Sequence, residues 1–261
     1  MKLSEKFSDG RNYINKTLWI ILIPILLDVF TLLTYQYIYQ VAYVPIRQLF
    51  TWKIGIISTP PSVRFILEDF PSVILQYNHS GFTGIINELS LFNVFLAITL
   101  LLVISFIQSG YLSVLSSISH KNVGVKDFFV GGNRFWFKFF LFQTFLMYPF
   151  LLMFIKRGFV YLAIVNTVFF YVKYSIVLDE GSIRENFSKG VAFFWDNIDL
   201  SIKMAFYFGF VFSLLSIVIY LMAGLGLLGI IIAIVLTAYF GAAINKSVLE
   251  IYRDTKEKAT G

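Results

Sequence analysis

The sequence predicts an all-α membrane protein: a polytopic bundle of about six transmembrane helices with further amphipathic helices at the membrane interface. Hydrophobic residues make up 58% of the 261 residues and charged residues only 14%, whereas soluble proteins average roughly 45–50% apolar and about 25% charged residues. The apolar residues also gather in continuous runs, each long enough to cross a hydrocarbon core of about 30 Å as a helix. Helices are expected because backbone groups in lipid must be satisfied within their own segment.

Six apolar runs, rich in Leu, Ile, Val and Phe, define the predicted spans. They cover residues 17–35, 91–109, 135–155, 159–178, 200–222 and 225–248. The third and fourth are separated only by Lys156, Arg157 and Gly158, which predicts a tight hairpin. The first run has no small-residue cleavage site after it, so we interpret it as a membrane helix and not as a signal peptide. Residues 1–261 are therefore expected to form a single integral membrane domain.

The distribution of positive charge predicts the orientation of the chain. With both termini in the cytoplasm, fifteen of the 21 Lys and Arg residues fall in inner segments and five in outer segments, while Lys173 lies within a span. An excess of Lys and Arg on the cytoplasmic side is the usual pattern of membrane proteins. The sequence therefore predicts a multi-pass protein of the cell membrane with cytoplasmic N- and C-termini.

The longest predicted loop, residues 36–90 on the outer side, is too apolar for a free linker. Within it, residues 62–70 are expected to form a short helix that places four apolar side chains on one face: Val63, Ile66, Leu67 and Phe70. Proline residues flank this stretch at Pro61 and Pro71. We therefore expect the loop to lie on the membrane or to cap the bundle from outside.

Two inner segments are predicted to be interfacial helices. Residues 122–134 mix charged and aromatic side chains and are broken by Gly131 and Gly132. Residues 182–197 begin with a capping box, Ser182 and Glu185. The apolar residues that follow recur at helical spacing: Ile183, Phe187, Val191, Phe194 and Ile198. The opposite face carries Arg184, Glu185 and Lys189, which we interpret as a candidate surface for docking a cytoplasmic partner.

Asp28 is the strongest candidate for an intramembrane functional group, because a carboxylate near the middle of a span costs at least roughly 2.5–3.5 kcal/mol on insertion scales. Pro24 lies one turn earlier and frees a backbone carbonyl. An ion or proton site is one interpretation. The other is structural, with Asp28 capping a neighbouring helix or pairing with Lys173 or Asn166.

Further polar positions extend this candidate site. Asn166 and Lys173 are seven residues apart and share one helix face, and Gln143 with Thr144 adds polar groups in the third span. Asn166 is expected at a depth similar to Asp28, and Lys173 nearer the cytoplasm, where its ammonium can reach the interface. For each of them the alternative is an ordinary interhelical hydrogen bond.

The residue inventory argues against catalysis, metal binding and nucleic-acid binding. The chain has no cysteine and only two histidines, His79 and His120, far apart in sequence, so thiolate and histidine metal sites are not expected. No nucleophile elbow, phosphate loop or zinc-protease motif is present. We therefore expect no catalytic residues, no metal and no cofactor, and the net charge of +6 follows from membrane topology.

Three stretches carry a resemblance to a protein family. They are residues 23–28 (IPILLD), residues 110–129, and residues 174–197 (YSIVLDEGSIRENFSKGVAFFWDN). Together they resemble poorly characterised polytopic membrane proteins of bacteria and archaea, which are similar to the membrane domain of some glycerophosphodiester phosphodiesterases. The resemblance implies the helical membrane architecture. Because the soluble catalytic domain of those phosphodiesterases is missing, it implies no hydrolytic activity.

These observations favour a transport-related, permease-like membrane subunit. The lipid bilayer is its expected environment, and the expected partners are a cytoplasmic protein such as an ATPase or further copies of the chain in a homo-oligomer. The main alternative is a non-catalytic scaffold that organises lipids or partner proteins, and a lipid-modifying enzyme is a third.

Overall fold

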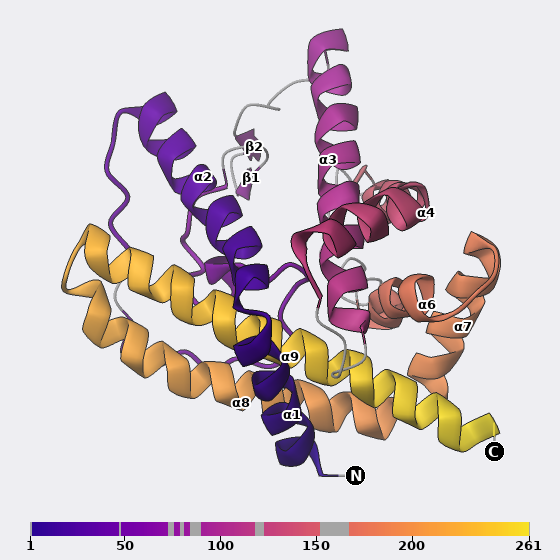
Figure 1. Ribbon diagram of the computed structural model, residues 1–261. Coiled ribbons are helices and arrows are strands. Elements are labelled where there is room, and N and C mark those ends of the chain that lie inside the picture. The colour runs from indigo at the N-terminus through magenta and orange to yellow at the C-terminus, as the bar shows by residue number, and fades with distance from the viewer. Residues whose placement is uncertain are drawn as a thin grey trace. The chain divides into compact units, whose positions relative to one another are not determined.

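The computed structural model describes residues 2–46, 48–72, 76–78, 81–83, 90–117, 123–151 and 167–260. These residues are mainly helical (Figure 1). The long helices are α1 (Leu3–Lys16), α2 (Leu22–Tyr39), α3 (Leu91–Ser116), α4 (Val125–Leu151), α7 (Ile183–Asp196), α8 (Ile198–Ala223) and α9 (Leu227–Thr260). Helix α6 (Val172–Leu178) is shorter, and β1 (Gln76–Asn78) pairs with β2 (Gly81–Thr83) in an antiparallel hairpin.

Four helices of the described chain are long and apolar enough to cross a membrane: Leu18–Tyr39, α3, α8 and Leu227–Ala259. They coincide with the first, second, fifth and sixth predicted spans, so the helical, membrane-associated character of the chain is confirmed. The third predicted span falls on α4, which is not among these four. The fourth is represented by the shorter apolar helix Phe169–Leu178. Residues 152–166 of these two predicted spans, including Asn166, lie outside the described residues.

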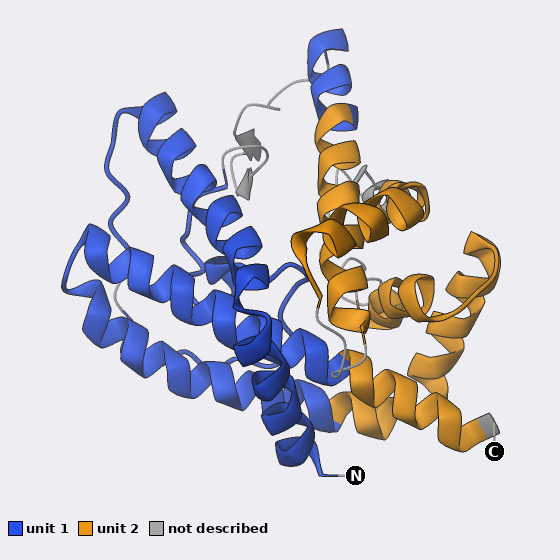
Figure 2. Cartoon of the chain, in the orientation of Figure 1, with its two compact units in different colours: residues 1–98, 203–248 blue, residues 99–202, 249–261 orange. Residues whose placement is uncertain are grey.

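The chain divides into two compact units (Figure 2). Unit 1 consists of residues 1–98 and 203–248, and unit 2 of residues 99–202 and 249–261. Each unit has its own buried residues. In unit 1 they include Ile20, Ile57 and Phe208, and in unit 2 they include Phe139 and Tyr174, all fully buried.

Helix α1 is a part of unit 1 that hydropathy does not reveal. A Cβ at Gly10 would clash with the Ala243 carbonyl, which shows how closely α1 approaches α9. The Ser247 hydroxyl donates to the Lys6 carbonyl at 2.9 Å, and the Tyr239 hydroxyl donates to Asn15 Oδ1 at 2.8 Å. Helix α1 is thus held on α9 by a glycine contact and by side-chain hydrogen bonds.

Helix α4 of unit 2 corrects the prediction of a separate interfacial helix at residues 122–134. The helix runs without a break through Gly131 and Gly132. A Cβ at Gly131 would clash with the Ser113 side chain, and one at Gly132 would lie 2.8 Å from the Phe106 ring. The two glycines therefore allow α3 and α4 to pack closely, and they do not end a helix.

Helix α7 confirms the predicted helix at residues 182–197 and part of its predicted apolar face, since Phe194 is buried and Phe187 packs against Phe142. The Ser182 hydroxyl caps it by accepting from the Glu185 amide at 3.3 Å, as the capping box predicts. Its buried residues are Asn186, Gly190, Phe193 and Phe194, whereas Ile198 is 40% exposed. A Cβ at Gly190 would lie 2.6 Å from Val172, so the buried face is set by close packing on α6 as well as by apolar residues.

Candidate functional site

The loop that follows α2 is inserted among the helices of unit 1, which corrects the expectation that it lies outside the bundle. We call residues 40–72 the inserted loop; Arg47 within it lies outside the described residues. The first limb of this loop, which contains Thr51, Lys53 and Gly55, runs along α8. The Thr51 amide donates to Ser216 Oγ at 3.2 Å, and the Lys53 amide donates to Ser213 Oγ at 2.8 Å. Further down, the Gly55 amide donates to the Ala205 carbonyl at 3.0 Å.

The sequence of α8 explains why an extended chain can lie against it. Ala205, Gly209, Ser213 and Ser216 share one helix face. At Gly209 a Cβ would clash with the Lys53 carbonyl oxygen, so the loop backbone touches the helix backbone. The hydroxyls of Ser213 and Ser216 also accept hydrogen bonds from the Lys53 and Thr51 amides, which lie outside helices and strands. From Thr51 to Gly55 the loop follows α8 for at most about 14 Å, the reach of four extended residues.

The inserted loop turns at residues 58–61, against α9. The Asn245 side-chain amide donates to the Ser58 carbonyl at 3.0 Å. One turn earlier, a Cβ at Gly241 would clash with Pro61. The Ser58 hydroxyl donates to the Pro60 carbonyl at 2.9 Å, which closes the turn. The small residue Gly241 therefore allows the inserted loop to pack closely against α9.

The second limb of the inserted loop, which begins at Ser62 and Val63, is held by Asp28. The Asp28 carboxylate accepts from the Ser62 hydroxyl at 2.8 Å and from the Val63 amide at 2.7 Å, and its residue is only 6% exposed. Val63 begins a short 3₁₀ turn, Val63–Phe65. The contacts of Asp28 are thus those of the structural interpretation, in which the carboxylate caps the start of another helical segment.

The predicted helix at residues 62–70 is reduced to this 3₁₀ turn, in a stretch with Pro61 and Pro71 on its two sides. Its predicted apolar face is confirmed nonetheless. All four side chains are buried, with exposed fractions of 0% for Val63, 5% for Ile66, 8% for Leu67 and 2% for Phe70.

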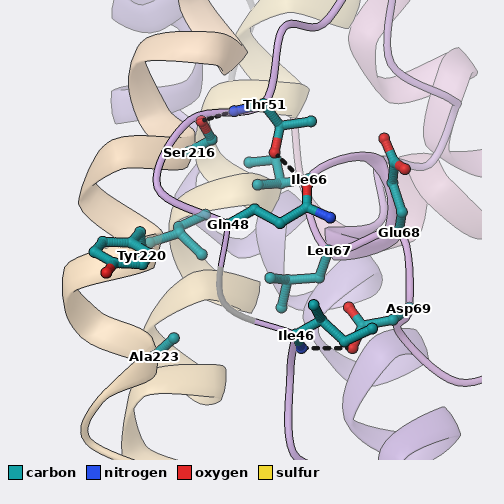
Figure 3. A pocket seen from close by; sticks show the side chains of 11 residues that line it. Ile46, Gln48, Thr51, Ile66, Leu67, Glu68, Asp69, Ser216, Tyr220 and Ala223 are labelled. Atoms are coloured by element: carbon teal, nitrogen blue, oxygen red, sulfur yellow. Dashed lines mark hydrogen bonds between the residues drawn. The ribbon is translucent and has the colours of Figure 1, made fainter.

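A cavity of about 300 Å³ opens beside the inserted loop, where its two limbs meet the end of α8 (Figure 3). It is lined by Ile46, Gln48, Thr51, Ile66, Leu67, Glu68, Asp69, Ser216, Ile219, Tyr220 and Ala223. The Ile46 amide donates to Asp69 Oδ2 at 2.8 Å, and the Thr51 hydroxyl donates to Gln48 Oε1 at 3.2 Å. Glu68, one of the lining residues, lies with its Oε1 2.6 Å from the ammonium of the buried Lys53.

The polar residues predicted for the intramembrane site fall in different units. Asp28 and Pro24 belong to α2 of unit 1, where Pro24 is buried in the first turn of the helix. Gln143 of unit 2 donates to Gln108, which confirms the interhelical hydrogen bond as its contact. Lys173, also in unit 2, is buried with its ammonium 4.0 Å from the centre of the Phe170 ring. Asn166 lies outside the described residues.

A polar network in unit 2 was not predicted from the sequence. Asp179, which follows α6, accepts from Ser175 Oγ at 2.7 Å, from the Tyr252 hydroxyl at 2.8 Å and from Lys256 Nζ at 2.6 Å. Tyr252 and Lys256 come from the end of α9, more than seventy residues away in sequence. Little in the sequence indicates this network. The acidic pair Asp179 and Glu180 precedes a helix, and such a pair usually marks a solvated helix start.

Asn186 extends this network into α7. Its fully buried side chain donates to the Ser175 carbonyl at 3.2 Å and to the Asp179 carbonyl at 3.3 Å, and it accepts from Lys138 Nζ at 3.3 Å. The network therefore ties α4, α6, α7 and α9 together at the polar end of unit 2.

The three residues of the predicted docking surface differ in the contacts that their side chains make within the protein. The Glu185 carboxylate accepts from the Ser182 hydroxyl at 3.1 Å, and Lys189 Nζ donates to the Glu180 carbonyl at 3.0 Å. The Arg184 side chain is exposed. Two of the three thus support the start of α7 itself.

The Asp179 network should make the stability of the protein sensitive to acid. Burial alone would raise the pKa of Asp179, but hydrogen bonds from Lys256, Ser175 and Tyr252 outweigh it and hold the pKa below the ordinary value of 3.8. A carboxylate with a depressed pKa stabilises the folded state above its unfolded pKa, and this stabilisation is lost as the pH falls through the folded pKa. We therefore expect the loss to occur below pH 3.8.

The measurement is the thermal unfolding midpoint in detergent, taken from about pH 6 to about pH 2. Asp179→Asn should lower the midpoint at the upper end and remove part of the acid-dependent fall. Lys256→Gln should move that fall toward higher pH, because the nearest cation is gone. An acid-dependent fall that is identical in Asp179→Asn and in the unchanged protein would contradict the prediction.

Among the residues that the structure describes, no group of three or more His, Cys, Asp or Glu side chains is placed to hold a metal ion. In unit 1 the inserted loop and the cavity beside it provide hydrogen-bonding groups and charged side chains. Comparison with models of known protein families, with curated proteins and with solved structures found no match to this chain.

Proposed function

We propose that this chain is a transport-related, permease-like membrane protein in which the inserted loop is a re-entrant loop that borders a solute pathway. The observation that carries this proposal is the path of the loop along α8 and α9, two helices long and apolar enough to cross a membrane. Non-helical backbone at membrane depth is tolerated only where protein buries it or where it lines a water-filled cavity.

The proposed topology gives this path a direction. In it the chain has six spans and cytoplasmic termini, so the inserted loop enters from the outer face and the cavity near Ala223 opens outward. The turn of the loop lies next to Asn245. Asn245 is eighteen residues from the start of α9 at Leu227, or about 27 Å along the helix axis. The loop would then reach most of the way across the bilayer from outside.

The buried polar groups of unit 1 favour transport over a passive scaffold. Asp28 is 6% exposed, Lys53 is 7% exposed and Asn245 is fully buried. Ionisable groups inside a membrane are costly and usually mark solute or ion pathways. Asp28 and Lys53 hold the inserted loop through Ser62, Val63 and Glu68, so they support a pathway through the position of the loop that they fix. A cytoplasmic ATPase remains a proposed partner, with exposed Arg184 on α7 as its proposed contact.

Transport can be tested by reconstituting the purified protein in liposomes and measuring the uptake of labelled ions, amino acids and small amines. The chain has no cysteine, so a single thiol introduced by Ser58→Cys reports on the turn of the loop without background. We expect uptake above that of protein-free liposomes. We also expect a membrane-impermeant thiol reagent, added from the outer face, to modify the thiol at position 58 and block this uptake.

The matched control is Leu214→Cys, because Leu214 is an apolar residue of α8 that is 48% exposed in the isolated chain and is expected to face lipid. The reagent should leave this variant unmodified and its uptake unchanged. Uptake no greater than that of protein-free liposomes would contradict the proposal. So would a thiol at position 58 that reacts only from the cytoplasmic face.

A further inference from the structure

We propose that the cavity beside the inserted loop binds a small organic cation, a primary amine with a short apolar body. As the substrate site of a transporter this inference rests on the proposed function, whereas the binding itself does not. The cavity lies within unit 1, and all of its lining residues come from the inserted loop and α8.

The charge of the cavity wall favours a cation. Its two ionisable groups with charge at neutral pH are the carboxylates of Glu68 and Asp69. Glu68 is paired with Lys53, which is buried and is not among the residues that line the cavity. Asp69 makes no ion pair with any residue that the structure describes; it is fixed by the hydrogen bond from the Ile46 amide. Among the described residues, Asp69 is therefore a fixed carboxylate of the cavity wall that no cation pairs.

The remainder of the wall favours an organic cation over a metal ion. Ile46, Ile66, Leu67, Ile219 and Ala223 supply apolar surface. Calcium needs six to eight oxygen ligands, and the described residues contain no suitable acidic cluster. A protonated primary amine, by contrast, has three N–H donors for the oxygens of the wall. Its alkyl chain can contact the apolar side chains.

Two further lining side chains suit the same ligand. The Tyr220 ring can attract a cation through its π face, and Gln48 Oε1 is an acceptor at the cavity wall, where it already receives the Thr51 hydroxyl. Figure 3 shows Tyr220 on α8 and Asp69 on the inserted loop at different sides of the cavity. A volume of about 300 Å³ is at the lower end of the range for small-molecule sites, and a short alkylamine fits within it.

The test uses three probes of nearly equal size and different charge: n-butylamine, 1-butanol and butyrate. Each is titrated calorimetrically into the full-length protein in nanodiscs of neutral lipid. We expect binding of butylamine and at least about tenfold weaker binding of the other two, a difference of about 1.4 kcal/mol. Asp69→Asn keeps an acceptor for the Ile46 amide but removes the charge, and it should weaken butylamine binding at least about tenfold.

Two further variants complete the design. Glu5→Gln makes the same change of charge on exposed α1, away from the cavity, and should leave butylamine binding unchanged. Ala223→Leu narrows the cavity by three carbon atoms without altering any charge and should weaken butylamine binding, which keeps the test decisive if Asp69→Asn folds poorly. Equal binding to Asp69→Asn, Ala223→Leu and the unchanged protein would overturn the proposal.

Arg47 separates the lining residues Ile46 and Gln48 in sequence and lies outside the described residues. The butyrate titration tests whether this positive charge dominates the site. Tighter binding of butyrate than of butylamine would show an anion site and would overturn the proposal. The two proposals can fail separately. Butylamine binding without any uptake leaves the site and removes transport, whereas uptake of other solutes without butylamine binding leaves transport and removes this ligand.

Discussion

Gly209→Ala is expected to destabilise the protein, although alanine is the better helix former. In the middle of a helix, alanine is favoured over glycine by about 1 kcal/mol. Here the new Cβ would clash with the Lys53 carbonyl oxygen and would lie 2.9 Å from the Lys53 carbonyl carbon and 3.0 Å from Ile54 Cα. These are backbone atoms of the inserted loop, held on both sides by the hydrogen bonds of Lys53 and Gly55 to α8.

Because the loop backbone cannot move aside without breaking these bonds, the clash should outweigh the gain in helix propensity. Overpacking a close contact costs typically about 1–3 kcal/mol. The thermal unfolding midpoint in detergent should therefore fall in Gly209→Ala. Gly124→Ala is the comparison without a clash, because a Cβ at Gly124 would have no heavy atom within 4 Å; its midpoint should fall less than that of Gly209→Ala, by no more than the loss of a glycine N-cap. A midpoint that rises in Gly209→Ala would mean that the inserted loop does not lie on α8.

The four longest apolar helices were predictable because the bilayer imposes both their length and their composition. Each of them is recognisable in the sequence as a continuous apolar run: Leu18–Tyr39, α3, α8 and α9. Helix α1 gives no such signal, since its residues are mostly polar and only Gly10, Tyr13 and Ile14 are buried. Its position depends on a glycine that lets it approach α9, and hydropathy carries no information about such contacts.

Glycine is also the reason that the prediction at residues 122–134 was wrong. Gly131 and Gly132 were interpreted as a helix break, because glycine weakens an isolated helix. In unit 2 they are the places where α4 meets Ser113 and Phe106 of α3. The same residue type can end a helix or allow two helices to touch, and only the tertiary neighbour decides which.

The candidate site was half predictable. The cost of a buried carboxylate identified Asp28 from the sequence, and periodicity identified the buried face of Val63, Ile66, Leu67 and Phe70. The link between the two was not readable, because Ser62 and Val63 lie 34 and 35 residues from Asp28. The serines and the glycine of α8 that receive the inserted loop are ordinary helix residues until their partner is known.

Asp28→Ala is expected to release the inserted loop from α2. The Ser62 hydroxyl and the Val63 amide both donate to the Asp28 carboxylate, and alanine accepts from neither. A buried donor left without a partner costs about 1–3 kcal/mol, and two donors are affected here. Asp28→Asn should be intermediate, because its amide oxygen can accept from one donor while its NH₂ group faces the other.

Two measurements distinguish this anchoring role from an ion or proton site. The first is the thermal midpoint, which should fall in the order unchanged protein, Asp28→Asn, Asp28→Ala. The second is the reactivity of a thiol introduced by Ile57→Cys, at a position that is fully buried in the inserted loop. This thiol should become more reactive in the same order. Thr31→Val is the control, because the Thr31 hydroxyl donates within α2 to the Leu27 carbonyl and makes no contact with the loop that the structure records.

The outcome for Asp28→Asn decides between the two interpretations of this residue. If the variant keeps its midpoint and a protected thiol at position 57 but loses uptake in liposomes, Asp28 is a coupling group and its hydrogen bonds to Ser62 and Val63 are incidental. If stability and protection fall together with uptake, the carboxylate acts by holding the loop. We expect the second result, since both Asp28 oxygens are already engaged by loop donors at 2.7–2.8 Å.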